Sequence, residues 1–232
     1  MKNPFRYFKT SPDVIRLTVM MYIRFPLSLR QVEELLFERG IDVSYETVRF
    51  WWNRFEPLFA AQIRKRRLTH PGYHSNWRWH LDEVFVKVNG ETRYLWRVVD
   101  HEGEVLDAIV TKKRDRKAAL NILKRLIKKY GRPAKIVTDR LRSYKAALND
   151  LGGNIPHETK RWMNNRAENS HLIFRRRERA MCHFRSVASL QKFVSIQGQV
   201  QNHFNAQRHL IDQSNYRKLR SEALDEWRAL AA

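Results

Sequence analysis

The segment WHLDEVFVKVNGETRYLWRVVD, residues 79–100, decides the fold of this chain. Apolar and polar residues alternate with a period of two on both sides of Asn89-Gly90. This dipeptide between two alternating runs is the strongest short signal for a β-hairpin. A third run, EVLDAIVTKK at 104–113, follows a turn at 101–103. The sequence therefore predicts a three-stranded meander.

The residues after the meander predict a helix, a fourth strand and then further helices. The segment RKAALNILKRLIKKYG at 116–131 carries apolar residues at helical spacing, and AKIVTD at 134–139 reads as a short apolar strand. This order predicts an α/β fold in which helices flank a mixed sheet. It fits the ribonuclease H-like fold, although order alone does not exclude other α/β folds. The later helices are expected at 139–153, 166–180, 186–204 and 219–230.

Three helices are predicted in the first 65 residues. Ser28 with Gln31 makes a capping-box pattern at the start of the second helix, Gly40 ends that helix, and Ser44 caps the third. Three short helices with a tight glycine-containing turn between the last two indicate an all-α helix-turn-helix domain, with an ordinary three-helix bundle as the alternative. The exposed side chains expected near a DNA groove are Tyr45, Glu46, Arg49 and Asn53.

Changes of pattern along the chain predict four segments. We expect the helix-turn-helix domain at 1–65 and a basic linker at 66–76, which contains Pro71-Gly72. The α/β domain is expected at 77–210, and a C-terminal helical tail at 211–232.

The composition indicates a polyanionic partner. The 232 residues carry a net charge of +21, and the pI is about 10.6. Residues 1–70 contain 13 basic and 7 acidic groups, and residues 71–232 contain 32 and 17, so both parts are expected to touch the same polyanion. Nucleic acid is the polyanion that such an excess favours. The alternatives are a ribosomal or general RNA-binding protein, or a chain that lysine keeps soluble.

The sequence also excludes several classes of protein. The single cysteine, Cys182, rules out an internal disulfide bond and a CxxC zinc site. The longest apolar stretch, near Val19–Ile23, is short and is closed by Arg24, so no membrane span is expected. We therefore expect a cytoplasmic, nucleoid-associated protein.

Two aspartates occupy informative positions on the predicted strands. Asp82 shares one strand face with Val84, Val86 and Val88. An acid on this apolar face needs a partner or a chemical task, unless it lies at a solvated strand end. Asp139 directly follows the fourth strand, where a carboxylate is poised beside the crevice at the sheet edge. For an isolated aspartate, the N-cap of the next helix is the simpler interpretation.

Glu168 lies near the start of the helix expected at 166–180. With Asn165 as the N-cap, Glu168 takes the third helical position, where a capping-box contact is a sufficient explanation. A carboxylate followed by arginines on one helix face also suits a metal ion that faces a phosphodiester, because the acid holds the cation and the guanidinium groups hold phosphates. The residues on the face of Glu168, at offsets of +3, +4, +7 and +11, are His171, Leu172, Arg175 and Arg179.

The segments WHLDEVFVKVNGETRYLWRVVD, IVTDRLRSY and NNRAENSH…RRRER closely resemble DDE transposases of bacterial insertion sequences. Among these, they fit the replicative, cointegrate-forming group named after insertion sequence six, over about residues 10–210. The resemblance implies that Asp82, Asp139 and Glu168 are the catalytic triad and the metal ligands of an integrase-type core. The interval of 29 residues from Asp139 to Glu168 is shorter than in some relatives, which indicates a trimmed connection. The short N-terminus fits a different start site or a missing leader.

The resemblance also implies a reaction and its partners. Such enzymes use two Mg²⁺ ions, about 3.5–4 Å apart and replaceable by Mn²⁺, to cleave DNA at the transposon ends and to join the freed 3′-hydroxyl group to target DNA. The expected partners are double-stranded terminal inverted repeats and target DNA, bound by a homodimer or a larger assembly. The helix-turn-helix is expected to read the inverted repeats, and the DNA phosphates are expected to contact Arg175, Arg176 and Arg179.

Two other kinds of protein share part of this pattern. A ribonuclease H-like nuclease or resolvase uses the same metal chemistry without strand transfer, but it does not need DNA-reading helices at the N-terminus. A non-catalytic helix-turn-helix regulator, or a decayed transposase, needs only DNA binding. The three intact acids argue against decay.

Overall fold

The computed structural model describes residues 3–68, 78–139, 141–152, 155–159, 164–205 and 211–231. The chain forms two compact units, Met1–His70 with Gln199–Ala232, and Pro71–Gly198. Of the linker expected at 66–76, only residues 66–68 belong to the described part, and these continue a helix.

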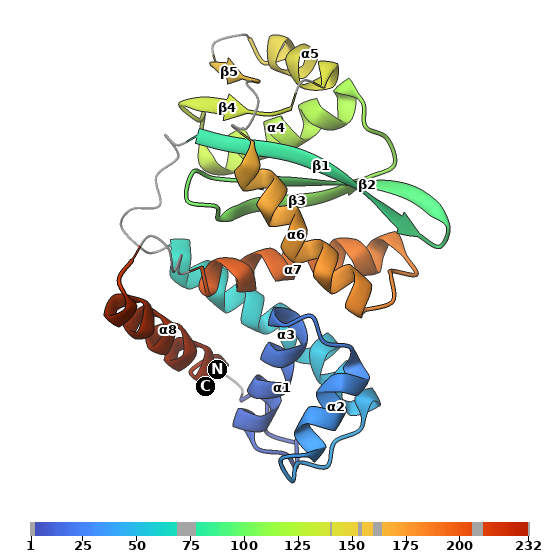
Figure 1. Cartoon of the computed structure of the whole chain (residues 1–232), viewed down its shortest axis with the longest axis vertical. Helices are drawn as coiled ribbons and strands as arrows, with labels where there is room; N and C mark the ends of the chain where they lie inside the picture. The colour runs from blue at the N-terminus through green and yellow to red at the C-terminus, as the bar shows by residue number, and fades with distance from the viewer. Residues whose placement is uncertain are drawn as a thin grey trace. The chain divides into compact units, whose positions relative to one another are not determined.

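A five-stranded mixed sheet forms the centre of the unit Pro71–Gly198 (Figure 1). The strand order is β3-β2-β1-β4-β5, with β1 antiparallel to β2 and parallel to β4. β3 is antiparallel to β2, and β5 is parallel to β4. The strands are β1 (Arg78–Val88), β2 (Glu91–Val99), β3 (Val105–Thr111), β4 (Lys135–Val137) and β5 (His157–Glu158).

The predicted meander and fourth strand are therefore present, whereas the two-residue strand β5 was not predicted. Asn89 and Gly90 join β1 to β2 with φ angles of 49° and 81°. Positive φ at both residues is what a two-residue type I′ hairpin loop requires, and it explains why Asn-Gly is found there.

Helices cover both faces of the sheet (Figure 1). Trp79 and Leu81 of β1 point to the face that packs on the first two helices after the meander, and the buried residues of this layer form one hydrophobic core. Val99 and Val105 point to the other face, where Ala167 packs on them. These helices are α4 (Arg116–Tyr130) and α5 (Arg142–Asp150) on the first face, and α6 (Asn165–Ala180) on the second.

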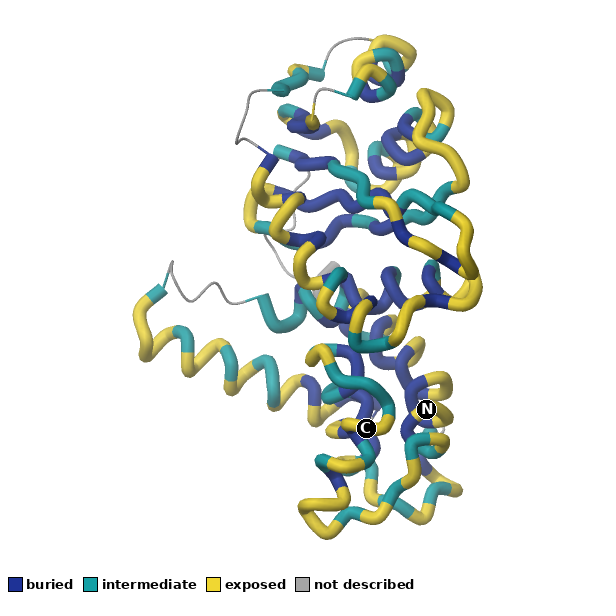
Figure 2. The backbone as a smooth tube through the Cα atoms, turned by 45° about the vertical axis from the view of Figure 1, so that its right-hand side comes forward, coloured by how far each residue is buried: buried dark blue, intermediate teal, exposed yellow. Residues whose placement is uncertain are grey.

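This arrangement confirms the predicted α/β class with a ribonuclease H-like core. Figure 2 shows buried residues along the central strands and the inward sides of the helices, while the outer sides are exposed. Because side chains alternate along a strand, neighbouring residues of β1 belong to different layers. Asp82 and Glu83 therefore leave the strand on opposite faces.

The edge strand β3 is covered by a side chain of α7 (Val187–His203). The Gln191 carboxamide accepts a hydrogen bond from the Val110 amide (2.8 Å) and donates one to the Ala108 carbonyl (2.9 Å). Unpaired backbone groups on an edge strand can pair with another chain. Gln191 satisfies two of these groups within the molecule.

The second unit contains the three predicted N-terminal helices, α1 (Pro12–Arg24), α2 (Leu29–Phe37) and α3 (Tyr45–Leu68). The predicted capping box of Ser28 and Gln31 is present, with both of its hydrogen bonds. The third helix is 24 residues long rather than short, because it continues through Pro57 and the basic residues after it.

The helix α8 (Gln213–Arg228) belongs to the same unit. The Trp227 indole is 2% exposed and donates to the Arg16 carbonyl (3.0 Å), while the Arg16 guanidinium donates to the Leu230 carbonyl (2.7 Å). The indole also packs edge-on against Phe59, with ring centroids 5.5 Å apart. The segment expected as a C-terminal tail thus shares a core with α1 and α3.

Within the described ranges, none of the helices combines the length and the apolar character that crossing a membrane demands.

We predict that Trp227→Ala destabilises the helical unit by about 3–5 kcal/mol, because it leaves a cavity against Phe59 and removes a buried hydrogen bond. Urea unfolding followed by circular dichroism measures the change. Leu219→Ala on the same helix, where the side chain is 45% exposed, is the control and should change stability by less than about 0.5 kcal/mol. Equal effects of the two substitutions would contradict the packing role of α8.

Candidate active site

Asp82 lies on the face of β1 that α6 covers. Its carboxylate oxygen Oδ2 is 3.2 Å from Nε2 of His171, and the side chains are 17% and 9% exposed. Across the strand pair, Asp82 stands opposite Arg97 of β2, whose Nε donates to the Ser170 hydroxyl (2.7 Å). Arg97 is fully buried, and this burial lowers its pKa to about 10. A histidine of α6 thus lies beside this half-buried acid.

The start of α6 is fixed to β1 through its N-cap residue. The Asn164 carboxamide donates to the Leu81 carbonyl (2.9 Å) and makes no hydrogen bond to its own helix. The expectation that Asn165 is the N-cap is wrong, because Asn165 is already the first helical residue. Glu168 is therefore the fourth helical residue rather than the third, and the capping-box explanation for it does not apply.

Further along the helix, Arg175 donates to the Phe85 carbonyl of β1 and to the Glu178 carboxylate. Asn164, His171 and Arg175 therefore contact β1 at residues 81, 82 and 85. These three residues are separated by seven and four positions, which places them on one stripe of a helix with 3.6 residues per turn.

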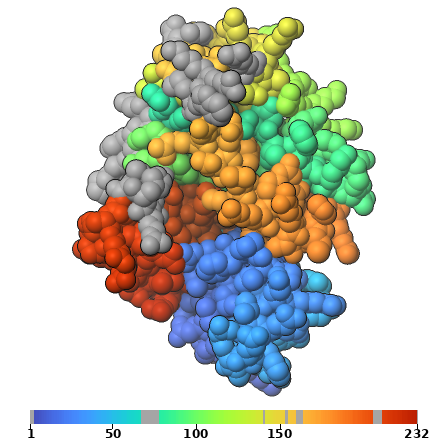
Figure 3. All heavy atoms as spheres, viewed as in Figure 1, coloured from blue at the N-terminus to red at the C-terminus, as the bar shows by residue number. Residues whose placement is uncertain are grey.

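Glu168 belongs to the same stripe, four positions after Asn164 and three before His171. Its neighbours in this stripe, Asn164 and His171, contact β1 at residues 81 and 82. Its side chain is exposed, and within the described ranges it has no hydrogen bond or ion pair. Figure 3 shows α6, in orange, on the surface of its unit, so an exposed position on this helix is open to solvent.

Asp139 follows β4 and is exposed. Its carboxylate accepts a hydrogen bond from the Leu141 amide (3.0 Å) and so stabilises the turn before α5. The N-cap of α5 is Leu141, so the simple capping role considered for Asp139 is not observed. β4 is parallel to β1 and Val137 pairs with His80, so Asp139, two residues later, lies beside the middle of β1.

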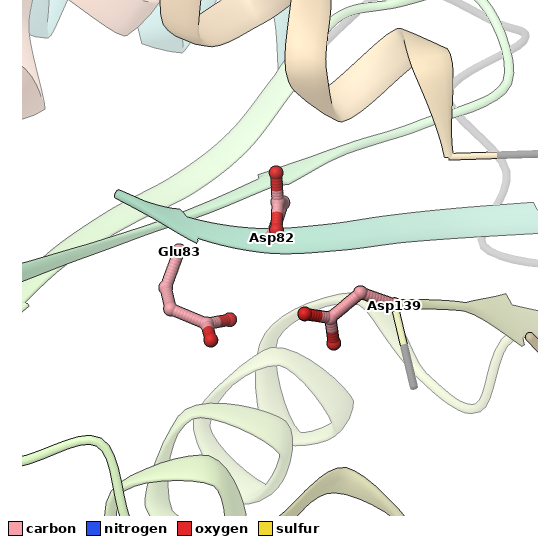
Figure 4. A group of neighbouring side chains, drawn as sticks. All are labelled: Asp82, Glu83 and Asp139. Atoms are coloured by element: carbon pink, nitrogen blue, oxygen red, sulfur yellow. The ribbon is translucent and has the colours of Figure 1, made fainter. Parts of the chain in front are cut away.

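Three carboxylates meet at this point. One oxygen each of Asp82, Glu83 and Asp139 lie within 4.8 Å of one another. Figure 4 shows Asp82 on the α6 side of β1, and Glu83 and Asp139 turned toward each other on the other side. Among the predicted triad residues, the structure thus brings Asp82 and Asp139 together, while Glu168 is outside this oxygen group.

Glu83 is the member that the sequence analysis missed. Its side chain is 1% exposed, accepts a hydrogen bond from the Tyr144 hydroxyl (2.6 Å) and lies 3.2 Å from an Arg114 nitrogen. Burial raises the pKa of Glu83 to about 7, and the negative charges of Asp139 and Asp82 act in the same direction. The Tyr144 hydrogen bond and the Arg114 charge oppose this rise.

The donor atoms of this group suit a hard divalent cation. Mg²⁺ and Mn²⁺ prefer oxygen ligands, and carboxylates supply both the oxygen atoms and the charge. Three carboxylates within 4.8 Å also repel one another, so a cation between them removes an unfavourable interaction. The residues present therefore fit the metal that the sequence analysis expected.

A second acidic group, Asp100, Glu102 and Glu104, occupies the turn between β2 and β3. One Asp100 oxygen accepts hydrogen bonds from the backbone amides of Glu102 and Glu104, both 2.9 Å long. This pattern is typical of an aspartate that shapes a turn, and it accounts for the group without a ligand.

The predicted DNA-contact residues are dispersed. On α6, Arg176 and Arg179 are exposed, while Arg175 is half-buried and engaged with β1. On α3, Arg49 is exposed, forms an ion pair with Glu46 (2.8 Å) and lies 5.5 Å from the centre of the Tyr45 ring. Asn53 is exposed on the next turn of the same helix.

Comparison with known proteins identifies the family of this chain. Residues 76–207 match a family model described as a DDE domain, so this part of the chain is the core of a DDE-type transposase. The transposase of the insertion sequence-like element IS431mec of Staphylococcus aureus (strain NCTC 8325 / PS 47) is 36% identical over 174 residues, 73% of this chain and 75% of the relative. The Staphylococcus aureus transposase of IS257 in transposon Tn4003 gives the same identity and coverage. The chain belongs to the IS6 family of insertion-sequence transposases.

Solved structures show more distant similarity. The HTLV-2 integrase catalytic core domain in complex with magnesium (dimeric form) is 19% identical, with a TM-score of 0.38 over 66% of this chain and 87% of that chain. The catalytic domain of Mos1 mariner transposase is 11% identical, with a TM-score of 0.37 over 75% of this chain and 92% of that chain.

The raised pKa of Glu83 predicts a pH dependence of stability in the metal-free protein. Between pH 4.5 and about 7 the folded state retains a proton that the unfolded state has lost, so stability falls as the pH rises through this window. Glu83→Gln removes this loss. From pH 5 to pH 7, its unfolding free energy should rise relative to wild type by on the order of 2 kcal/mol, since each pKa unit corresponds to about 1.4 kcal/mol.

Urea unfolding in the presence of a chelator measures this difference. Glu102→Gln, a change of the same type at an exposed position, should follow wild type at both pH values. If the Glu83→Gln and wild-type stabilities run parallel with pH, the carboxyl group of Glu83 is not perturbed.

Proposed function

We propose that Asp82, Asp139 and Glu168 are the catalytic triad of this transposase and that they hold two Mg²⁺ ions, which Mn²⁺ can replace. The observation that carries the assignment is the stripe of α6 that contacts β1, because helical spacing puts Glu168 on this stripe, between Asn164 and His171. The proximity of Asp82 and Asp139 supports the other two positions. Glu168 then completes the ligand set from the exposed side, where a phosphodiester can approach.

When bound, the two cations activate the attacking oxygen and stabilise the charge on the leaving oxygen. The protein supplies the fixed frame for this chemistry. Nε2 of His171 lies 3.2 Å from one oxygen of Asp82, and the Leu141 amide donates a hydrogen bond to one oxygen of Asp139. Hydrogen bonds of this kind to ligating carboxylates orient them for the metal.

The proposed reaction has two phosphoryl-transfer steps. In the first, water attacks the phosphorus at the transposon end, one P–O bond forms, and the bond to the 3′ oxygen breaks to release a 3′-hydroxyl group. In the second, this hydroxyl group attacks a phosphodiester of target DNA and displaces another 3′ oxygen. The bonds made and broken balance in each step, and the enzyme forms no covalent intermediate.

The DNA partners are the double-stranded terminal inverted repeats and the target DNA. Arg176 and Arg179 are exposed on α6 and suited to phosphate contacts. Arg175 donates to β1, so only part of its guanidinium is available to a phosphate. Tyr45, Arg49 and Asn53 of α3 are proposed to read the inverted repeats. Two transposon ends must be brought together, so the active form on DNA is a homodimer or a larger assembly. Its place in the cell is the nucleoid, in the cytoplasm.

We predict that Asp139→Asn and Glu168→Gln each lower Mg²⁺-dependent cleavage and strand transfer by about 10³-fold, equal to about 4 kcal/mol of transition-state stabilisation. The physical reason is the loss of a charged metal ligand. Gel analysis of a labelled transposon-end duplex measures both steps, and DNA binding in chelator should be unchanged.

Glu102→Gln, an exposed acid in the turn after β2, is the matched control and should retain wild-type activity. Full activity of Glu168→Gln would remove this residue from the triad. Nicking by the wild-type protein without any joined product would instead indicate a nuclease or resolvase, and DNA binding without nicking would indicate a regulator.

A further inference from the structure

A basic segment borders the acidic group on the side away from α6. It runs from Lys112 to Lys117, between β3 and the first turn of α4, and has the sequence KKRDRK. Its Arg114 lies 3.2 Å from Glu83, whose carboxylate belongs to the acidic group. Since α4 and α6 cover opposite faces of the sheet, the Lys112–Lys117 segment and the arginines of α6 flank the acids from two sides.

Three of the five cations in the segment have no acidic partner among the residues that the structure describes. Arg116 forms an ion pair with Asp150, and Arg114 pairs with Glu83. Among the described residues, no acid pairs with Lys112, Lys113 or Lys117, and all three side chains are exposed. The one acid of the segment, Asp115, is used as the N-cap of α4, where it accepts from the Ala118 amide (2.9 Å).

The position of these charges distinguishes them from an ordinary solvated face. The far end of α4 also carries exposed cations, Lys128 and Lys129, but these belong to its last turn, about 20 Å along the helix from its start. Of these two groups of cations, the Lys112–Lys117 segment is the one with an ion pair to the acidic group, through Arg114. Gathering like charges beside a reactive centre raises the local concentration of a polyanion there.

Arg114 has a second use in this arrangement. Without metal, its guanidinium compensates the negative charge of Glu83. A cation held by the acids would supply that compensation, and the guanidinium of Arg114, whose side chain is 39% exposed, would then be available to a phosphate. Arginine suits this exchange because its planar fork binds a carboxylate or a phosphate with the same geometry.

We propose that the Lys112–Lys117 segment binds the phosphate backbone of duplex DNA next to the scissile bond, opposite the contacts made by α6. Lys112 and Lys113 neutralise backbone phosphates, and Arg114 binds the phosphate nearest the acids. The inference rests on the proposed function for the identity of the reactive centre. The binding itself is independent of sequence, because it addresses only phosphates.

The test compares two double substitutions with the same change of charge. Lys112→Ala/Lys113→Ala removes two cations from the proposed surface, and Lys128→Ala/Lys129→Ala removes two from the other end of α4. Affinity for a random-sequence 40-base-pair duplex is measured on the full chain in chelator, at several salt concentrations. Each phosphate contact contributes about 0.9 to the slope of log affinity against log salt.

We expect the first variant to lose about 2 units of this slope and roughly tenfold in affinity at moderate salt, while the second stays close to wild type. Equal losses in the two variants would reduce the effect to net charge and overturn the proposal. An unchanged slope in the first variant, or a loss confined to single-stranded DNA, would also overturn it. Thermal unfolding of both variants confirms that the fold is retained.

Because binding is measured without metal, its outcome is separate from that of the proposed function. A reduced slope together with a fully active Asp139→Asn variant would leave the DNA surface standing and remove the triad. An unchanged slope together with an inactive Asp139→Asn variant would do the reverse.

Discussion

The docking of α6 on β1 is the constraint on which the site depends. The helix is fixed by polar contacts, from Asn164 to a strand carbonyl, from Ser170 to the buried Arg97 and from His171 to Asp82. Such contacts are directional, so they determine the rotation of the helix about its axis as well as its position. An apolar seam of the same area would hold the helix but tolerate more rotation. Burying the Arg97 guanidinium costs free energy, and its hydrogen bond to the Ser170 hydroxyl offsets part of this cost.

Much of the fold was predictable because its signals are local. The alternation around Asn89-Gly90 gave the hairpin, and the helical spacing in 116–131 gave α4 with its buried face. Asp82 and Asp139 were identifiable because each follows or interrupts an apolar strand. Glu83 and Arg114 were not, because strand alternation assigns Glu83 to the opposite face and says nothing about a loop residue that reaches it. The packing of α8 on α1 could not be predicted either, because it joins residues that are 211 positions apart in the sequence.

The electrostatics of the site are a balance between acids that repel one another and cations placed around them. Asp82 and Asp139 help to raise the pKa of Glu83, while Arg114 and the Tyr144 hydroxyl lower it. The basic residues of the chain therefore have different roles. Arg97 and Arg177 are buried and structural, Arg114 and Arg175 are engaged with the core, and Arg176 and Lys113 face solvent. Net charge alone identifies the partner as a polyanion, and burial identifies which cations are available to it.

The helical unit is assembled from both ends of the polypeptide, and this has a consequence for biosynthesis. Between the last residue of α3 and the first of α8 the ribosome must add 144 residues. At about 5–20 residues per second this takes roughly 7–30 s. During this time the surface around Phe59, on which Trp227 later packs, is exposed. The nascent chain can complete the five-stranded sheet in that interval, but not the helical unit. Maturation of the two units is thus ordered in time, and the one that carries α3 is finished last.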